Sequence, residues 1–113
     1  MSTATDRLDL TFGALADPTR RDIVARVVAR EVSVSVLAES YAMSFAAVQR
    51  HVAVLERAGL VSKERRGRER LVRADVDTIR AAARLLDQYE EIWRGRIGRL
   101  EDIFAEPAEG DRP

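Results

Sequence analysis

The chain has 113 residues, of which 46% are hydrophobic and 34% charged, a composition typical of one compact domain rather than a multidomain enzyme. It contains no cysteine, which excludes disulfides, thiolate nucleophiles and cysteine-based metal sites. The single histidine, His51, is too little for the multi-histidine sites that transition metals favour. No stretch is apolar enough to span a membrane, and the N-terminus lacks the layout of a signal peptide. We therefore expect a cytoplasmic protein without a cofactor.

The net charge is zero, but the charges are distributed unevenly along the chain. Residues 44–73 carry eight Lys and Arg against three acids, whereas residues 1–43 and 74–113 carry more acids than bases. A basic segment within a neutral protein is typical of a small nucleic-acid-binding domain that turns one edge toward phosphate. An ordinary solvated surface gives the same balance, so the local pattern of residues has to decide between the two.

Two helices are predicted in the N-terminal part of the chain. The first is defined by apolar residues at helical spacing, Leu8, Phe12 and Leu15, and it ends before Asp17 and Pro18. Asp17 can accept backbone hydrogen bonds as an N-cap and Pro18 suits the first helical position, so a second helix begins here and runs to about Arg30. We expect its buried side to consist of four aliphatic residues: Ile23, Val24, Val27 and Val28.

The next segment has the spacing of a helix-turn-helix motif. Ser33 indicates the N-cap of a short helix over residues 34–40, and a turn follows at residues 42–44. Ser44 then indicates the N-cap of a longer helix that runs to Arg57 and has an apolar side of Val48, Val52 and Leu55. Two helices joined by a short turn hold a fixed angle, so the second can project while the first braces it.

The outward side of this longer helix differs from that of an ordinary solvated helix. It mixes small, amide and cationic side chains in place of alternating Glu and Lys: Phe45, Ala46, Gln49, Arg50 and Arg57. Such a surface is typical of a helix that reads a DNA groove. Gln49 is the best candidate for a base contact, because an amide can bond adenine at two atoms, while Arg50 could bind guanine or phosphate.

A β-hairpin is predicted after the helix. Gly59 can end the helix in a left-handed conformation, and two short strands, one opening at Leu60 and one closing at Val72, meet around Gly67. The hairpin is rich in cations: Lys63, Arg65, Arg66, Arg68 and Arg70. Charged strands also guard an exposed edge against aggregation, but arginines clustered beside a helix-turn-helix favour contact with phosphate or the minor groove.

A long amphipathic helix is predicted over residues 76–104, where apolar residues recur every three or four positions. At 1.5 Å per residue it would extend roughly 43 Å, which is more than the core of one small domain can cover. We therefore expect a homodimer whose recognition helices lie about one DNA turn, roughly 34 Å, apart on an inverted repeat. The residues expected at its interface are Leu8, Phe12, Leu85, Leu86, Tyr89, Ile92, Trp93, Ile97 and Leu100. Which apolar side of the last helix is core and which is interface stays open.

Together these elements predict a mainly α, winged helix-turn-helix fold with a two-stranded β-hairpin wing and long terminal helices for dimerisation. We expect a single domain over residues 1–104. Residues 105–113 contain two prolines, a glycine and three acids, and are expected to form a disordered tail.

The order of elements and several motifs resemble the arsenical-resistance repressor (ArsR) family of winged-helix regulators over about residues 8–104. The motifs are ALADPTRRDIV at 14–24, VSVSVLAESYAMSFAAVQRHVAVLERAGLV at 32–61 and the glycine-tipped arginine hairpin at 64–73. The stretch LLDQYEEIWRGRIGRLEDI resembles a branch with a tryptophan-bearing last helix and no known metal site. The resemblance implies a homodimeric transcriptional repressor that often controls its own operon.

The resemblance also implies which residues face DNA. Positions of the family's recognition helix that usually do so are occupied by Ser44, Phe45, Gln49, Arg50 and His51, and the hairpin cations join them. His51 is implied at the DNA backbone, although a lone histidine on a helix is more often a packed residue. The chain departs from the family pattern at two positions of this segment: Ala42 stands where glycine is common, and Ala46 where proline is frequent.

The effector and one alternative function stay open. Metal-sensing relatives use cysteines on the short helix or acid and histidine pairs on the last helix, and this chain has neither. An inducer would be an apolar small molecule, a lipid or a partner protein, unless abundance alone controls binding. The alternative is a winged-helix module that binds protein or RNA, but only Phe45 offers an aromatic ring near the basic segment. No constellation of catalytic residues favours an enzyme.

Overall fold

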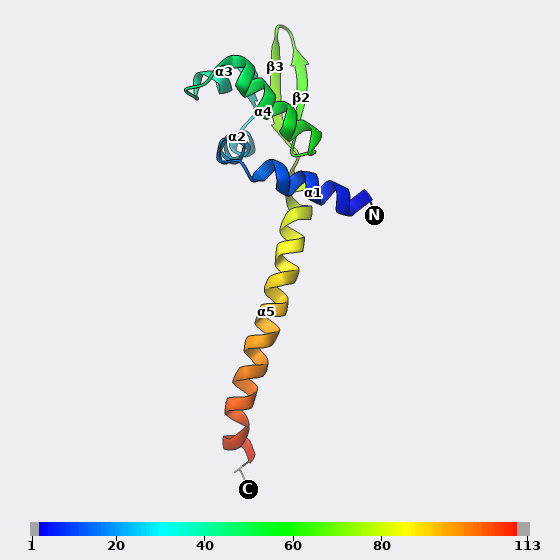
Figure 1. Cartoon of the computed structure of the whole chain (residues 1–113), viewed down its shortest axis with the longest axis vertical. Coiled ribbons are helices and arrows are strands. Elements are labelled where there is room, and N and C mark those ends of the chain that lie inside the picture. Colours follow the sequence, from blue (N-terminus) through cyan, green and yellow to red (C-terminus); the bar gives the residue numbers. More distant parts are fainter. Residues whose placement is uncertain (1–2, 111–113) are drawn as a thin grey trace. The chain divides into compact units, whose positions relative to one another are not determined.

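The computed structural model describes residues 3–110, except for the side chains of residues 4 and 106–110. Its elements follow one another in the order α1 (Thr3–Leu15), α2 (Pro18–Ala29), β1 (Val32–Ser33), α3 (Val34–Glu39), α4 (Phe45–Arg57), β2 (Val61–Arg66), β3 (Glu69–Ala74) and α5 (Val76–Gly110) (Figure 1). The prediction of a mainly helical fold with a winged helix-turn-helix is confirmed.

The chain divides into two compact units after Ala82. The first contains α1 to α4, the sheet and the first turns of α5, and the second consists of the rest of α5. The single domain predicted over residues 1–104 stays a prediction, because α5 itself runs through this division without a break. α5 also continues past the predicted end at Phe104 to Gly110, since extending a formed helix costs far less than starting one. Residues 111–113 of the predicted tail lie outside the described residues.

Side-chain caps begin three of the helices where the sequence predicts them. Asp17 accepts a hydrogen bond from the backbone N–H of Arg20 at 3.0 Å, and this capping contact lowers the pKa of the Asp17 carboxyl. The Ser33 hydroxyl accepts from the N–H of Val36, and the Ser44 hydroxyl from that of Ala47, each at 3.1 Å. These contacts satisfy N–H groups that the helix itself leaves without a partner. They hold the start of α4 at a defined residue.

The sheet has one strand more than predicted. β1 pairs antiparallel with β3 and β3 with β2, so the strand order is β1-β3-β2. The short β1 contributes two register pairs, Val32 with Val72 and Ser33 with Leu71. Gly67 turns the hairpin with a φ of 62°, and Gly59 follows α4 with a φ of 78°, both in the left-handed region that glycine adopts without a steric penalty. β1 thus anchors the base of the wing beside the start of α3.

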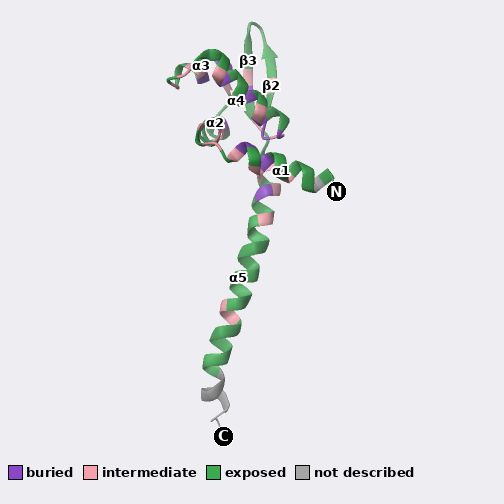
Figure 2. Ribbon diagram, in the orientation of Figure 1, coloured by how far each residue is buried: buried purple, intermediate pink, exposed green. Residues whose placement is uncertain are grey.

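The hydrophobic core lies within the first unit, between the helices and the sheet (Figure 2). Its largest fully buried side chains are Ile23, Leu37, Val48, Val52, Leu55, Leu60 and Val72. The predicted buried side of α2 is narrower than expected, because Val28 is 51% exposed while Ile23 and Val27 are buried. Residues four apart share one side of a helix, whereas each single step turns the side chain by about 100°. The buried side of α4 is as predicted, which leaves its other side free.

Candidate nucleic-acid interface

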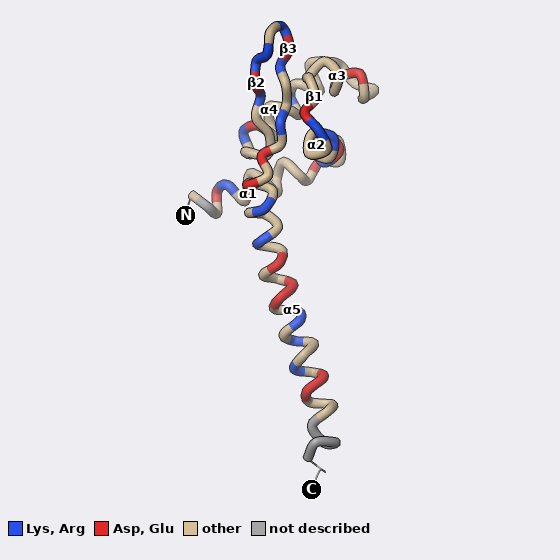
Figure 3. The backbone as a smooth tube through the Cα atoms, turned by 180° about the vertical axis from the view of Figure 1, so that it is seen from behind, with Lys and Arg blue, Asp and Glu red and all other residues tan. Residues whose placement is uncertain are grey.

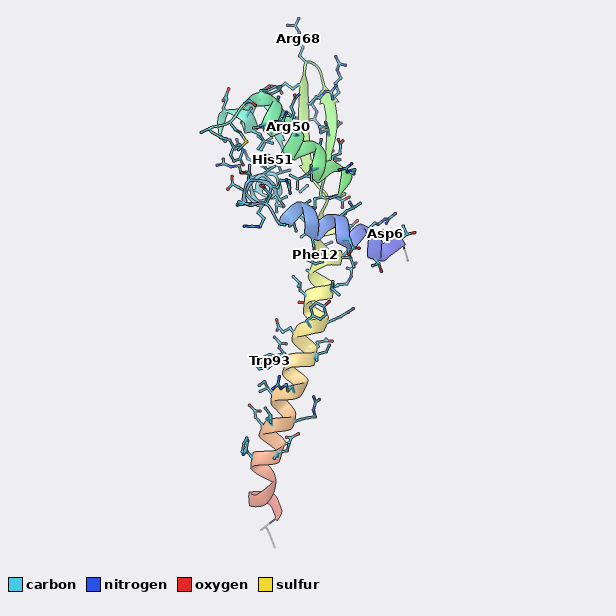
Figure 4. All side chains as sticks on the ribbon, in the orientation of Figure 1. Asp6, Phe12, Arg50, His51, Arg68 and Trp93 are labelled. Atoms are coloured by element: carbon cyan, nitrogen blue, oxygen red, sulfur yellow. The ribbon has the colours of Figure 1, made fainter. Side chains whose placement is uncertain are left out.

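The exposed side of α4 begins at its first residue. Phe45 is 48% exposed, an unusual state for a phenylalanine, and Gln49 and Arg50 are also exposed. On the opposite side Val48 and Leu55 are buried in the core, so the helix cannot rotate without losing its packing. The predicted readout residues therefore project from a firmly held helix, as the sticks of Figure 4 show for Arg50.

A hollow of the surface joins this side of α4 to the wing. It is lined by residues of α3, α4 and both sides of the hairpin: Val34, Ser35, Phe45, Gln49, Val52, Lys63, Arg68, Glu69 and Arg70. Five of the residues predicted to face DNA thus share one concave surface. Arg68 extends from the tip of the hairpin, beyond the strands themselves (Figure 4).

The strand register divides the wing residues between two faces. Arg65 lies directly opposite Arg70, and Lys63 lies opposite Val72. Because directly opposed residues share a face and neighbours along a strand alternate, Lys63, Arg65 and Arg70 stand on the face of the sheet that buries Val72. Like charges directly across an antiparallel pair repel each other. The inner face of the wing therefore continues from the hydrophobic core into a cationic surface.

The outer face of the wing is largely neutralised by ion pairs. Glu64 contacts Arg73 at 3.1 Å and Arg66 at 3.6 Å, and Arg73 also contacts Glu31 at 2.9 Å. The predicted DNA contact Arg66 is therefore on the other face from Arg65, and its charge is already paired. Figure 3 shows that both strands carry basic and acidic residues.

Four predicted cations keep their charge uncompensated. In the part of the chain that the structure describes, no ion pair involves Arg50, Arg65, Arg68 or Arg70. The remaining cation, Lys63, approaches Glu56 at 3.5 Å. A phosphate would meet these four guanidinium groups without first displacing a carboxylate.

His51 is placed differently from the other predicted residues. It is half-buried, and its Nδ1 lies 3.3 Å from the Nη1 atom of Arg20 in α2. Arg20 is itself held by its Nε, which donates to the carbonyl of Ala14 at 2.7 Å, and it lies 3.9 Å from Asp17. Sequence reasoning missed Arg20. The signal that could have found it is its position three residues after the capping Asp17, which turns it back over the start of α2.

A second polar cluster ties α2 to the turn of the helix-turn-helix. The Tyr41 hydroxyl donates to Oδ2 of Asp22 at 2.6 Å, and Nε of Arg26 donates to the same oxygen at 2.8 Å. The guanidinium of Arg26 also lies over the Tyr41 ring, 5.4 Å from its centre. Arg26 lowers the pKa of Asp22, and burial together with Asp22 raises the pKa of Tyr41 to about 12. The turn that positions α4 is thus fastened to α2 by a side-chain network that sequence reasoning missed.

The predicted dimer residues fall into an exposed and a half-buried set. On α5, Trp93 is 53% and Ile92 68% exposed, and Leu86, Tyr89 and Leu100 are exposed as well. The half-buried residues are Leu8, Phe12, Leu85 and Ile97. Ile103, which has the same helical spacing as Leu85 and Ile92, is also exposed, as is Phe104. A single chain therefore leaves an apolar surface uncovered along the second unit.

The described residues form neither a metal site nor a membrane-spanning helix. No three His, Cys, Asp or Glu side chains among them come together as a metal site would require. Of the helices in residues 3–110, none combines the length and the apolar character needed to cross a membrane.

Several known proteins are similar to this chain in sequence and in fold. A helix-turn-helix domain family matches residues 15–64. The crystal structure of an ArsR family transcriptional regulator is 30% identical, covers 83% of this chain and 97% of its own, and superimposes with a TM-score of 0.75. An ArsR-like transcriptional regulator from Rhodococcus sp. RHA1 is 29% identical, covers 90% of this chain and 96% of its own, and also has a TM-score of 0.75.

A more distant structure has the same fold. The homodimeric winged helix-turn-helix DNA-binding domain of a Mycobacterium bovis protein is 24% identical, covers 77% of this chain and 82% of its own, and has a TM-score of 0.64. No curated protein sequence matches the chain.

Proposed function

Because this chain belongs to the ArsR family of transcriptional regulators, we propose that it is a homodimeric repressor of an inverted-repeat operator. Its family and its helix-turn-helix motif are those of DNA-binding regulators of transcription. In the proposed complex α4 enters the major groove and the wing contacts the adjacent backbone or minor groove. The observation that supports this proposal most directly is the hollow, which is lined by Phe45 and Gln49 of α4 and by Arg68 and Arg70 of the wing.

The charge arrangement supports this role over that of an ordinary solvated surface. Arg65 and Arg70 repel each other across the hairpin, and neither has a carboxylate partner among the described residues. If the charges served solubility alone, the inner face could carry ion pairs like those of the outer face, where Glu64 contacts both Arg66 and Arg73. Such pairs would avoid the repulsion. An anion such as phosphate relieves the repulsion on the inner face, which favours a polyanion as the partner.

The apolar surface of α5 supports the proposed homodimer. Large exposed side chains such as Tyr89, Trp93 and Leu100 recur at helical spacing, and contiguous exposed apolar surface marks an interaction site. A second copy offers an identical surface, and two-fold symmetry then presents two α4 helices to successive turns of DNA. We further propose that the chain represses its own gene. The absence of cysteine from the sequence supports the further proposal that its effector is not a thiophilic metal.

A gel-shift titration tests the proposal. The full chain is titrated into duplexes from the DNA upstream of its own gene, at near-physiological salt and with scrambled duplex as competitor. We expect one competitor-resistant complex containing two protein chains. Binding no tighter than to the scrambled duplex would contradict autoregulation, and selective binding to RNA or to a partner protein in parallel titrations would favour the alternative module.

A further inference from the structure

Phe45 is the most unusual side chain at the interface. It is the first residue of α4, nearly half of it is exposed, and it lines the hollow together with Gln49. Two buried core residues, Val34 and Val52, line the same hollow. The exposed part offers an apolar ring in a surface otherwise dominated by polar and cationic groups.

The backbone that carries the ring is held by a helix cap. The Ser44 hydroxyl caps α4 by accepting from the N–H of Ala47 at 3.1 Å, so the backbone that carries Phe45 does not fray. The N-terminal residues of a recognition helix are those that reach base edges in the major groove. In the proposed DNA complex, Phe45 therefore lies among the residues that contact base edges, not among those that contact only the backbone.

The chemistry of the major groove offers one apolar partner. Among the groups that base pairs display there, the C5 methyl of thymine is the only apolar group that projects into the groove. Cytosine carries just a hydrogen at C5, and the remaining groups donate or accept hydrogen bonds. Covering an exposed aromatic ring with polar base edges would desolvate those edges without replacing their hydrogen bonds. A thymine methyl avoids this cost.

The position of Gln49 on α4 predicts which base lies near that thymine. Residues four apart lie on one side of a helix, about 5–6 Å apart at Cβ, and the bases of one strand follow each other at about 3.4 Å. Phe45 and Gln49 thus address base pairs that are one or two steps apart. The amide of Gln49 matches adenine, which presents an acceptor and a donor side by side.

We propose that Phe45 is a specificity-determining residue, whose ring packs on the methyl of a thymine one or two base pairs from an adenine bound by Gln49 in each half-site. The inference rests on the proposed function, because it needs α4 in the major groove. It goes beyond it by specifying part of the operator from the hollow that contains both side chains.

Replacing thymine by uracil tests the inference, because this exchange removes the methyl and leaves the hydrogen-bonding groups unchanged. The full chain is first used to select duplexes from a randomised pool, and each thymine of the enriched sequence is then changed to uracil. We expect one position in each half-site where uracil weakens binding about fourfold, the effect of exposing one buried methyl group. The Phe45→Ala variant should bind the thymine and uracil duplexes equally.

Matched variants separate readout from folding. Gln49→Ala should retain the uracil penalty and lose the preference for adenine at the neighbouring position. Phe45→Leu keeps an apolar side chain and should retain a reduced penalty, and it serves in place of Phe45→Ala if circular dichroism shows the alanine variant to be unfolded.

The outcomes distinguish this inference from the proposed function. If the selection enriches an inverted repeat but no uracil exchange weakens wild-type binding, the inference is wrong and operator binding stands. A uracil penalty that persists in Phe45→Ala, or that Phe45→Leu leaves at its full wild-type size, overturns it as well. A selection that enriches no sequence overturns both.

Discussion

The guanidinium of Arg20 approaches Nδ1 of His51 at 3.3 Å and so joins the start of α2 to the middle of α4. A guanidinium carries only donors, so Nδ1 must accept, and the neutral ring must then hold its proton on Nε2. In this arrangement Nδ1 is engaged by Arg20 within the protein. The other nitrogen is the one left for the phosphate contact that the sequence resemblance implies for His51.

Nuclear magnetic resonance can check this tautomer directly, because His51 is the only histidine. We expect long-range proton-nitrogen spectra at pH 8 to show Nε2 protonated and Nδ1 unprotonated. Arg20→Met should shift both ring nitrogens by removing the donor. Arg21→Met is the matched control, since the Arg21 guanidinium donates to the carbonyl of Leu15 instead, and should leave the ring unchanged. A ring with its proton on Nδ1 would contradict the contact.

Loss of an arginine should change DNA binding when it lies on the inner face of the wing and not when it lies on the outer face. Arg70→Ala removes an unpaired cation of the inner face, and we expect the salt dependence of DNA affinity to flatten by about 0.9 in the logarithmic slope for one lost phosphate contact. The loss of affinity should be similar for all DNA sequences. The free protein should become slightly more stable, by about 0.2–1 kcal/mol, because the repulsion with Arg65 is relieved.

Arg73→Ala is the control for the wing, since Arg73 is already paired with Glu31 and Glu64 on the outer face. Its salt slope should equal that of the wild type. Binding titrations at several salt concentrations and thermal melts of the free proteins measure both effects. Equal slopes for all three proteins would remove the wing from the list of phosphate contacts.

Local chemistry explains which parts of this architecture the sequence predicts. Asp17, Ser33 and Ser44 cap their helices as expected, because a cap depends only on the residue and the next few backbone N–H groups. β1 was missed because its pairing of Val32 with Val72 joins segments far apart in the chain and two residues show no period.

The same distinction holds within the candidate site. The cations of the hairpin are visible in the sequence, but their division into a paired and an unpaired face follows from the register of β2 against β3. The contact of Arg20 with His51 depends on how α2 packs beside α4, which no local pattern contains.

The Tyr41 network makes a prediction for alkaline pH. A tyrosine of an unfolded chain ionises near pH 10, whereas the pKa of Tyr41 in the folded protein is about 12. Between these values the folded state binds more protons than the unfolded state, so stability is fully present below about pH 10 and falls as the pH rises toward 12. Denaturant titrations at pH 9 and 11 should show this loss in the wild type and a smaller one in Tyr41→Phe.

If Tyr41→Phe shows the full wild-type loss, Tyr41 does not titrate differently in the folded and unfolded states.

The proposed homodimer makes a prediction at Trp93, which is 53% exposed on α5. In a dimer its ring would be covered by the partner, so Trp93→Glu would bury an unpaired carboxylate and should weaken self-association by more than about a hundredfold. The first unit, residues 1–82, does not contain Trp93, and we expect it to remain folded in the variant. Analytical ultracentrifugation over a range of concentrations measures the association.

The control for Trp93 changes the charge of α5 by the same amount without touching the apolar residues. Arg84→Gln lowers the charge by one, as Trp93→Glu does, and Arg84 is exposed. It should associate like the wild type. Trp93 is also the only tryptophan, so its fluorescence in the wild type should shift to longer wavelength on dilution, as the ring becomes exposed to water. An unchanged spectrum and a persistent Trp93→Glu dimer would mean that the chain associates through a different surface, and Leu8 and Phe12 of α1 would be the next residues to replace.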